Sequence, residues 1–592
     1  MADTSDVQTA HAQEKALGSG SSATAADAAG AEKTEERSAQ HVGGAGKMRK
    51  PVWLRVFGHD ITAPFLLLFL SLMLFVPGQW TIPPLDRDEP RFTQATKQML
   101  ETDDYIDIRF QEEARHKKPV GIYWLQAAAV KLTGHGPDAP LWVYRLPSLI
   151  GAVICVLASF WLARAFMGPA GALLAGSFVA LAIITGVEAR LAKTDAMLCH
   201  DHHCAGGARA GVAERPGTQI VAAELPVLDG ACGERAHQGA RGAHGRRFDR
   251  CRVDGFSRRA AWFKGASPLL GAIWFVLLVS PWFVAIWIAT DGTFFTESIG
   301  KDLLGKVGQG QEGHGAPPLT HLGAMLGIFW PLPAFFLVTL PLIWRERSSP
   351  VVVFSAAWFL PSWIVFELVA TKLPHYTMPL LPALALPVAA ALLDGAGTHT
   401  RTWIRWIAAI LLALPAIGLA VAAFAGPVFL GAWPSPPGVV IMALGAVFAI
   451  GAASRVLRGR AIHAFPAVIL TAICVAVGFW GFVGPALTPI WVSPRLIQAI
   501  DEIPGCADRQ TREVVTSGFH EPSFIFLEGT RTRIISPKGA AEFLAQFTGD
   551  DPGICRVAAV ESREEPAFGG GQGDWSCAGG AKKGRRPQYQ WR

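Results

Sequence analysis

The chain has 592 residues, of which 51% are hydrophobic and 17% are charged. Soluble proteins carry about a quarter charged residues, and the apolar residues here gather in blocks of about 20, so the composition excludes a soluble globular protein and predicts a polytopic membrane protein. The net charge of +6 is modest, and the basic residues lie between the apolar blocks, which is typical of topology signals. We therefore expect no nucleic-acid partner.

The N-terminal region predicts a tail followed by a first span. Residues 1–46 are rich in Ala, Gly, Ser and Glu without an apolar period, which indicates a disordered tail and not a signal peptide. Basic residues at 47–55 precede the first apolar block, 60–78, so the positive-inside rule places the tail in the cytoplasm. Residues 79–140 then form a first periplasmic loop, with helical spacing at 90–101 and 121–132.

Nine further apolar blocks follow, and basic residues mark every second connection between the later blocks as cytoplasmic. These blocks are 142–165, 170–187, 268–289, 320–343, 351–369, 376–393, 404–424, 438–452 and 464–485. The membrane domain therefore covers 47–486, and the loops at 291–320 and 371–377 are expected to face outside.

The remaining residues, 487–592, have mixed polarity and predict a small periplasmic α/β domain with an irregular tail. Residues 513–516, 523–527 and 533–535 read as strands, and 540–547 as a helix. Cys506 and Cys555 both fall in this domain, but sequence spacing alone does not establish that they pair.

Residues 199–258 break the pattern of apolar blocks. They are rich in Gly, Ala, Arg, His and Cys and contain no span. The chain is expected outside at Asp195, yet residues 258–264 have the composition of a cytoplasmic connection, so an odd number of crossings is missing.

Two explanations of this segment stay open. Synonymous codons can be chosen so that residues 236–247, read one nucleotide later, give an apolar sequence. We hypothesise two compensating frameshifts, near Leu198 and within 252–258, that remove three crossings. The alternative is a genuine cytoplasmic or metal-binding insert, because residues 200–204 (His-Asp-His-His-Cys) resemble a cluster of metal ligands.

The most highly charged stretch near a span is residues 85–92, with three carboxylates and two guanidinium groups. Charge is costly in hydrocarbon, so this cluster lies at or beyond the membrane interface. Four more polar motifs fall on the same outer face. With the first, they are Arg-Asp-Glu-Pro-Arg-Phe at 87–92, Lys-Lys-Pro at 117–119, Arg-Leu-Ala-Lys-Thr-Asp at 190–195, Gln-Glu-Gly-His-Gly-Ala-Pro-Pro at 311–318 and Thr-Lys-Leu-Pro-His-Tyr-Thr-Met-Pro at 371–379.

These five motifs, in this order, resemble those of aminoarabinose-transferase-like integral-membrane glycosyltransferases, bacterial relatives of the protein O-mannosyltransferases with the GT-C fold. The resemblance covers roughly residues 55–535, apart from 199–258. It implies a mainly α, polytopic helical GT-C-type bundle in the bacterial inner membrane. It also implies a polyprenyl-phosphate-linked sugar donor, such as an undecaprenyl phosphate sugar, and an acceptor at the periplasmic face that is lipid A, another envelope glycan or a protein.

An inverting glycosyl transfer needs a carboxylate that takes the acceptor proton or stabilises the cationic sugar. By family position, Asp88 is the candidate general base, and Glu89 is expected to orient Asp88 or Arg91. Asp195 is a candidate for a second acidic contact to sugar or acceptor. The structural alternatives are an interfacial ion pair and a charge at a helix end.

The reaction also needs cations at the departing phosphate. In the family, the lysine at the position of Lys118 contacts the lipid phosphate, and the tyrosine at Tyr376 is a phosphate donor. The residue before that lysine can be acidic and metal-associated in relatives, but here it is Lys117, so a divalent metal stays an open question and no cofactor is assigned. The structural alternatives are a snorkelling lysine and an interfacial tyrosine. The full set of substrate-binding candidates is Arg91, Lys118, Glu312, His314, Lys372, His375 and Tyr376.

Two other functions compete with a glycosyltransferase. One is a transporter or flippase for a polyprenyl-linked substrate, and the other is an inactive, frameshifted product. Charges that cluster outside, and not along the spans at mid-membrane, favour the enzyme over the transporter.

We predict that the chain as written accumulates poorly in membranes, because the missing crossings leave its C-terminal half on the wrong side. A gene with the frame restored across 199–258 should insert stably, and the amount of folded protein extracted from membranes measures the difference. Equal insertion of the two chains would argue against the frameshift hypothesis, as would codons that give no apolar shifted frame.

Overall fold

The computed structural model describes residues 51–85, 87–196, 268–303, 305, 316–398, 400–545, 555–562, 574–579 and 588–590. The predictions made for residues 1–46 and 199–258, and for Glu312 and His314, lie outside the described residues and stay predictions.

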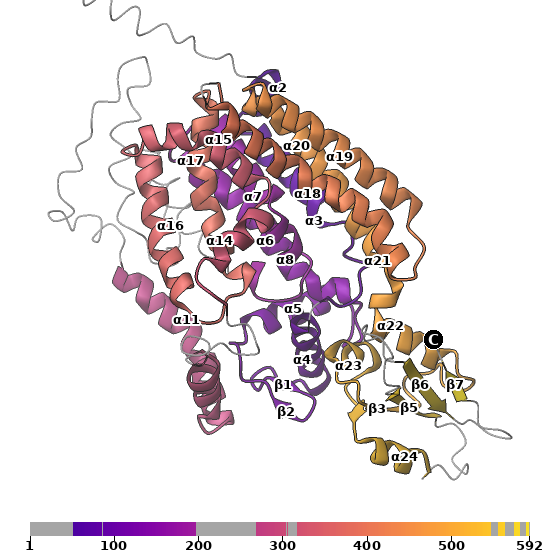
Figure 1. Ribbon diagram of the computed structural model, residues 1–592. Coiled ribbons are helices and arrows are strands. Elements are labelled where there is room, and N and C mark those ends of the chain that lie inside the picture. The colour runs from indigo at the N-terminus through magenta and orange to yellow at the C-terminus, as the bar shows by residue number, and fades with distance from the viewer. Residues whose placement is uncertain are drawn as a thin grey trace, which may run out of the picture. The chain divides into compact units, whose positions relative to one another are not determined.

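Each apolar block of the sequence contains helix, as Figure 1 shows. The membrane helices are α3 (Thr62–Phe75), α6 (Leu141–Arg164), α7 (Pro169–Leu181) with α8 (Ile183–Glu188), α11 (Pro268–Ala289), α14 (Thr320–Ile328) with α15 (Leu332–Arg345), α16 (Pro350–Leu368), η4 (Pro374–Leu380) with α17 (Leu381–Leu393), α18 (Thr402–Phe429), α19 (Pro436–Leu457), and α20 (Ala461–Val475) with η5 (Ala476–Val483). Short helices α2 (Val52–Phe57), α12 (Thr293–Phe295), η2 (Thr296–Leu303), α21 (Gly484–Ala486) and η6 (Thr488–Ile490) flank them.

Within the described ranges, six helices are long and apolar enough to cross a membrane, or up to eight spans if each of two bent helix pairs counts as one. α3 and α7 are shorter apolar helices. The prediction of a polytopic helical membrane protein is confirmed.

The core of the bundle forms around α7, which is buried along nearly its whole length. Small residues allow this, because they let neighbouring backbones approach closely. A Cβ added at Gly176 would lie 2.8 Å from Leu67 of α3 and 3.3 Å from the Val156 carbonyl oxygen of α6. The ring of Phe178 packs edge-on against Phe335 and Phe465 at 5.3 and 5.1 Å. Four helices therefore meet α7 through two of its residues.

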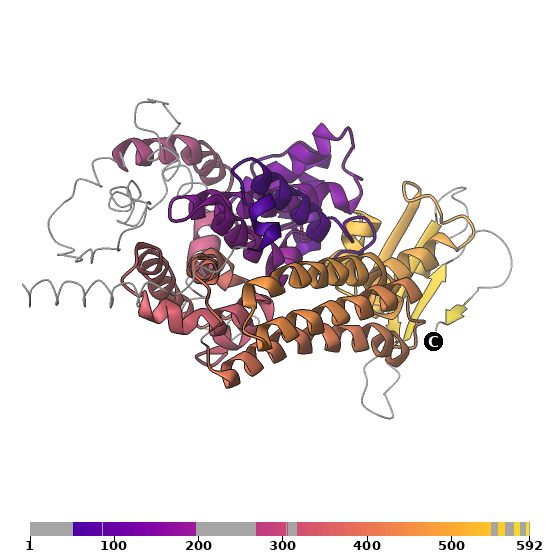
Figure 2. The same ribbon diagram turned by 90° about the horizontal axis from the view of Figure 1, so that it is seen from above.

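The outer helices have the opposite pattern, with large apolar side chains exposed. On α16, Leu360, Val365 and Leu368 are more than half exposed, and α18 and α19 carry similar rows. α18, α19 and α20 run side by side in Figures 1 and 2. Exposed apolar rows on long helices suit contact with lipid hydrocarbon.

The loop between α3 and α6 is largely folded. It contains α4 (Asp88–Thr102), a hairpin of β1 (Arg109–Phe110) and β2 (Glu113–Ala114), and α5 (Gly121–Leu132). The two helices expected from the spacing at 90–101 and 121–132 are therefore present. They pack together, and the Thr96 hydroxyl donates to Gln126 Oε1 at 2.6 Å.

The C-terminal region is an α/β domain with one five-stranded sheet in the order β4-β3-β5-β6-β7. β3 lies between β4 and β5 and pairs with both in parallel, and β6 and β7 continue the sheet antiparallel beyond β5. The elements are α22 (Val492–Asp501), β3 (Arg512–Ser517), α23 (Pro522–Glu528), β4 (Arg533–Ile534), α24 (Pro537–Ala545), β5 (Cys555–Ser562), β6 (Asp574–Gly579) and β7 (Gln588–Gln590).

Alternate residues of the strands serve two cores, because successive strand side chains point to opposite faces. Val514 and Val557 pack with α22 and α23, whereas Val515 and Ala558 pack with α24. The strand predicted at 523–527 was wrong, because these residues form α23. Pro522 stands in the first turn of that helix, where its fixed φ favours helix, and a short apolar run does not separate strand from helix by itself.

A disulfide joins Cys506 to Cys555, with the Cα atoms 5.2 Å apart. It ties the segment before β3 to the start of β5. The pairing that the sequence left open is therefore made in this domain. Disulfides persist in oxidising compartments.

We expect Cys506→Ala/Cys555→Ala to destabilise this domain by about 4 kcal/mol, the loop-entropy value for a closure of this length. Limited proteolysis of the full chain with and without reductant measures the loss. The matched control is Cys155→Ala/Cys474→Ala, which replaces two buried cysteines that are not in this disulfide and should leave the effect of reductant unchanged. Labelling of Cys506 or Cys555 without reduction would contradict the pairing.

Candidate active site at the start of α4

The side chain of Glu89 joins three segments at the start of α4. Its carboxylate accepts bonds from Nε and Nη2 of Arg145 at 2.7 and 2.9 Å. The backbone N–H groups of Leu85 and Ala192 donate to the same carboxylate at 2.6 and 3.0 Å. Both charged side chains are 0% exposed. α4, α6 and the segment after α8 are therefore fixed to one another at a single buried carboxylate.

The rest of the Arg145 guanidinium holds the loop before α4. Nη1 donates to the carbonyls of Gln79 and Ile82 at 3.1 and 3.0 Å, and Nη2 donates to that of Pro83 at 3.1 Å. Together with the two bonds to Glu89, these use all five N–H donors of the guanidinium. An isolated arginine in an apolar block is the sequence signal that could have identified Arg145.

Asp88 precedes this buried pair and is open to solvent, with its side chain 53% exposed. It stands in the first turn of α4, where the helix dipole favours negative charge. Arg91 Nη1 lies 3.6 Å from Asp88 Oδ1. In the described chain, therefore, Asp88 pairs with Arg91, while Glu89 pairs with Arg145 and not with either residue it was expected to orient.

A second group of charges follows α8. Lys193 Nζ lies 3.3 Å from Glu188 Oε1 and 3.7 Å from Asp195 Oδ2. Asp195 Oδ1 lies 4.0 Å from His375 Nε2, and the His375 ring packs edge-on against Tyr376 at 5.0 Å. The motif at 190–195 thus contacts the motif at 371–379, and through Ala192 it also contacts the motif at 87–92.

Lys372 has a different environment from its neighbours His375 and Tyr376. Its Nζ donates to the carbonyls of Glu367 and Val369, both at 2.8 Å, and the residue is only 8% exposed. It therefore satisfies carbonyls at the C-terminal end of α16, where a cation also suits the helix dipole. Lys372 therefore stabilises the C-terminal end of α16.

Lys118 is half-buried in the turn that leads into α5. Two neighbours that the motifs did not include are more buried: Arg115 and Tyr123. The Arg115 guanidinium lies 5.1 Å from the centroid of the Phe92 ring, and the Tyr123 ring lies 5.4 Å from it. Burial raises the pKa of the Tyr123 hydroxyl, Arg115 opposes that rise and Asp88 adds to it. Asp88, Arg115 and Tyr123 are thus within electrostatic reach of one another.

The site does not fit a divalent metal through the described residues. No group of three or more His, Cys, Asp and Glu side chains that could hold a metal ion occurs among them. His116 comes nearest, but its Nε2 faces Asp107 at 2.9 Å and its Nδ1 faces Glu297 at 3.2 Å. These two nitrogens point to opposite sides of one ring, so the two carboxylates do not share a metal with it.

The C-terminal domain docks on α4. Gln94 Nε2 donates to the Thr530 hydroxyl at 2.7 Å, and that hydroxyl donates to Glu101 at 2.7 Å. Arg87, the residue before Asp88, pairs with Glu521 at 3.2 Å. The helix that begins with Asp88 is thus held from the membrane side by Glu89 and from the domain side by these contacts.

No family model matches the chain, and no curated protein matches it in sequence. Solved structures of ArnT from Cupriavidus metallidurans match its fold. ArnT from Cupriavidus metallidurans bound to undecaprenyl phosphate is 16% identical, with a TM-score of 0.56 over 86% of this chain and 93% of that one. The apo state of the same protein gives the same values. The chain therefore has the fold of ArnT, and the expected GT-C-type architecture is confirmed.

A more distant structure, the apo form of the oligosaccharyltransferase from Archaeoglobus fulgidus, is 12% identical. Its TM-score is 0.41 over 85% of this chain and 69% of that one. This likeness is too weak to support an argument.

We predict that Glu89→Ala destabilises the protein by about 3–5 kcal/mol, because it leaves the Arg145 charge buried and unpaired. The matched control is Asp88→Ala, which should change stability by no more than about 0.5 kcal/mol because Asp88 is exposed. Thermal unfolding of the purified full chain compares the two. Glu89→Ala/Arg145→Met should recover part of the loss. Equal melting of the two single variants would show that the buried pair does not hold the site.

Proposed function

We propose, on the premise that this chain shares the fold of ArnT, that it is a membrane glycosyltransferase. It would transfer a sugar from a polyprenyl-phosphate donor to lipid A, another envelope glycan or a protein. The N-terminus would be cytoplasmic, and the site would face the periplasm of a bacterial inner membrane with the C-terminal domain. The disulfide in that domain supports this orientation, because it requires an oxidising compartment.

One observation carries the proposal. A solvent-exposed carboxylate, Asp88, stands next to a fully buried ion pair that fixes its helix in place. The same pair brings the motif of residues 190–195 to the motif of residues 87–92. A base needs this combination of access to the acceptor and a rigid support.

The chemistry proceeds in one displacement. Asp88 takes the proton of the acceptor hydroxyl, whose oxygen bonds to the anomeric carbon of the donor sugar. The bond from that carbon to the phosphate oxygen breaks, and its electron pair leaves with the polyprenyl phosphate. The configuration at the anomeric carbon inverts because the acceptor attacks from the face opposite the phosphate.

The other candidates take supporting roles in this reaction. Arg91 limits the movement of Asp88 through its pair at 3.6 Å. Lys118 and Tyr376 are proposed to donate to the departing phosphate, where negative charge grows in the transition state. Asp195 and His375, 4.0 Å apart, are proposed to contact sugar hydroxyls. Glu89 acts as a positioning residue through Arg145.

We expect Asp88→Asn to lower turnover by about 10²- to 10⁴-fold, the usual contribution of a general base, with insertion and donor binding unchanged. The measurement is transfer of labelled sugar from synthetic polyprenyl-phosphate pentoses and hexoses by the purified full chain. Glu113→Gln is the matched control, because it neutralises another exposed carboxylate of the same loop.

Near-normal turnover of Asp88→Asn would rule out Asp88 as the essential base. Absence of transfer by the unmodified and frame-restored chains, across all donors and acceptors, would undercut the enzyme itself. Movement of the intact donor across the membrane without transfer would instead favour a flippase.

A further inference from the structure

Arg115 is a buried cation without a carboxylate partner in the described chain. The residue is 8% exposed, and its Nε is buried without a hydrogen-bond partner. Other buried arginines are compensated. Arg145 pairs with Glu89, and Arg512 pairs with Glu528 and Asp501. Arg190 donates to three backbone carbonyls.

An uncompensated buried charge is costly. A lysine or histidine in this situation can lose its proton, whereas a guanidinium keeps its charge in proteins. No carboxylate among the described residues offsets this cost, whereas a bound anion would. A phosphate is well suited, because a guanidinium binds two phosphate oxygens with its planar fork.

A second buried donor lies beside Arg115. The Tyr123 side chain is 0% exposed. Its hydroxyl lies next to Arg115, which opposes the rise of the Tyr123 pKa on burial through its charge and a hydrogen bond, and no other described group accepts a hydrogen bond from that hydroxyl. Both side chains contact the ring of Phe92, which lies one helical turn after Asp88 on the same face of α4. The Nε–H group of Arg115 and the O–H group of Tyr123 thus both lack an acceptor, and both side chains contact a ring one helical turn from the proposed base.

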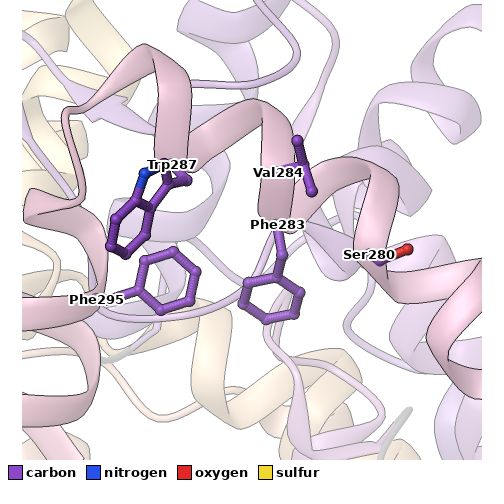
Figure 3. A pocket seen from close by; sticks show the side chains of 5 residues that line it. All are labelled: Ser280, Phe283, Val284, Trp287 and Phe295. Atoms are coloured by element: carbon purple, nitrogen blue, oxygen red, sulfur yellow. The ribbon is translucent and has the colours of Figure 1, made fainter.

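The surroundings of Arg115 continue into an apolar surface. Its neighbour His116 packs edge-on against Phe294 at 5.5 Å. Phe294 in turn contacts Phe283 and Phe295 at 6.3 and 5.4 Å. The rings of Phe283, Phe295 and Trp287 lie side by side along a hollow of about 270 Å³, as Figure 3 shows. Ser280 and Val284 complete its lining.

The aromatic cluster has a cation, Arg115, at one end and the apolar hollow at the other. This arrangement fits an amphiphilic ligand that carries both an anionic group and an apolar chain. A free phosphate would use only the cation, and a neutral isoprenoid only the hollow. Trp287 and Val284 are more than half exposed on α11, a helix apolar enough to lie in the membrane. A lipid chain therefore reaches the hollow from the bilayer.

We propose that Arg115 and Tyr123 bind the phosphate of the polyprenyl donor, and that the hollow on α11 and α12 holds the isoprene units next to it. This inference rests on the proposed function, because it names residues that hold the leaving group of that reaction. When the bond to the anomeric carbon breaks, the electron pair stays on the phosphate. Donors fixed at that oxygen stabilise the growing charge.

The test measures binding of polyprenyl phosphate, the product, to the full chain in lipid nanodiscs. Arg115→Met should weaken binding about 10- to 100-fold, the range for a hydrogen bond to a charged group. Arg115→Lys should recover part of the affinity, and Tyr123→Phe should weaken it about 5-fold. The matched control is Arg109→Met, which removes an exposed arginine of the same loop and should leave the affinity unchanged.

Thermal unfolding separates this role from a structural one. Arg115→Met removes an unpaired buried charge, so the melting temperature should hold or rise, whereas a structural arginine would lower it. Trp287→Ala should weaken binding of the long-chain lipid but not of a phosphate with a single isoprene unit, which cannot fill the hollow.

Three competitor arms identify the source of the anion: inorganic phosphate, phosphatidylglycerol vesicles and the phosphate-free polyprenol. All three should compete poorly. Strong competition by inorganic phosphate or phosphatidylglycerol would overturn the lipid assignment. Unchanged affinity of Arg115→Met and Arg115→Lys would overturn the inference even if sugar transfer is observed. Arg115-dependent binding without any transfer would reject the proposed enzyme and leave this site standing.

Discussion

The buried pair of Glu89 and Arg145 is the interaction on which the rest of the site depends. Arg145 of α6 donates two hydrogen bonds to the Glu89 carboxylate of α4 and three to carbonyls of the loop before α4. The backbone N–H groups of Leu85 in that loop and of Ala192 after α8 also donate to Glu89. A buried ion pair adds little net stability over an apolar replacement. What this pair provides is a single relative position for four segments, because each donor has one acceptor and misplacing any segment leaves a buried charge or amide unsatisfied.

This arrangement separates two acidic neighbours by function. Asp88 and Glu89 are consecutive, but a helix turns 100° per residue, so one carboxylate faces the interior while the other faces solvent. The Glu89 carboxylate pairs with Arg145 in the interior, and the Asp88 carboxylate stays accessible to solvent. The polar contacts of Thr530 and Glu521 with α4 then fix the same helix from the C-terminal domain. The domain is in this sense a part of the site's support.

The membrane bundle and the site have different physical requirements. Around α7 the bundle is closely packed with small residues and three phenylalanine rings, which give a rigid base. The outer rows of α16 and α18 are exposed and apolar, as contact with lipid requires. α11 combines both features, because its outer side chains are exposed and its end packs against the aromatic cluster of Phe92, Tyr123 and Phe294. Apolar side chains of α11 thus pack directly against the first turns of α4.

The sequence by itself determined the helical membrane architecture, because blocks of apolar residues have no other stable form in a bilayer. It also located Asp88, Asp195, His375 and Tyr376 on short polar motifs between spans, and the structure brings Asp195 and His375 together. Only the tertiary structure decided which charged side chains have partners inside the protein. Glu89 and Lys372 looked as functional as their neighbours in sequence, yet one pairs with Arg145 and the other closes the end of α16. The helix at 522–528 and the isolated charge of Arg115 were likewise invisible in sequence, because burial and partnership are properties of contacts between segments far apart in the chain.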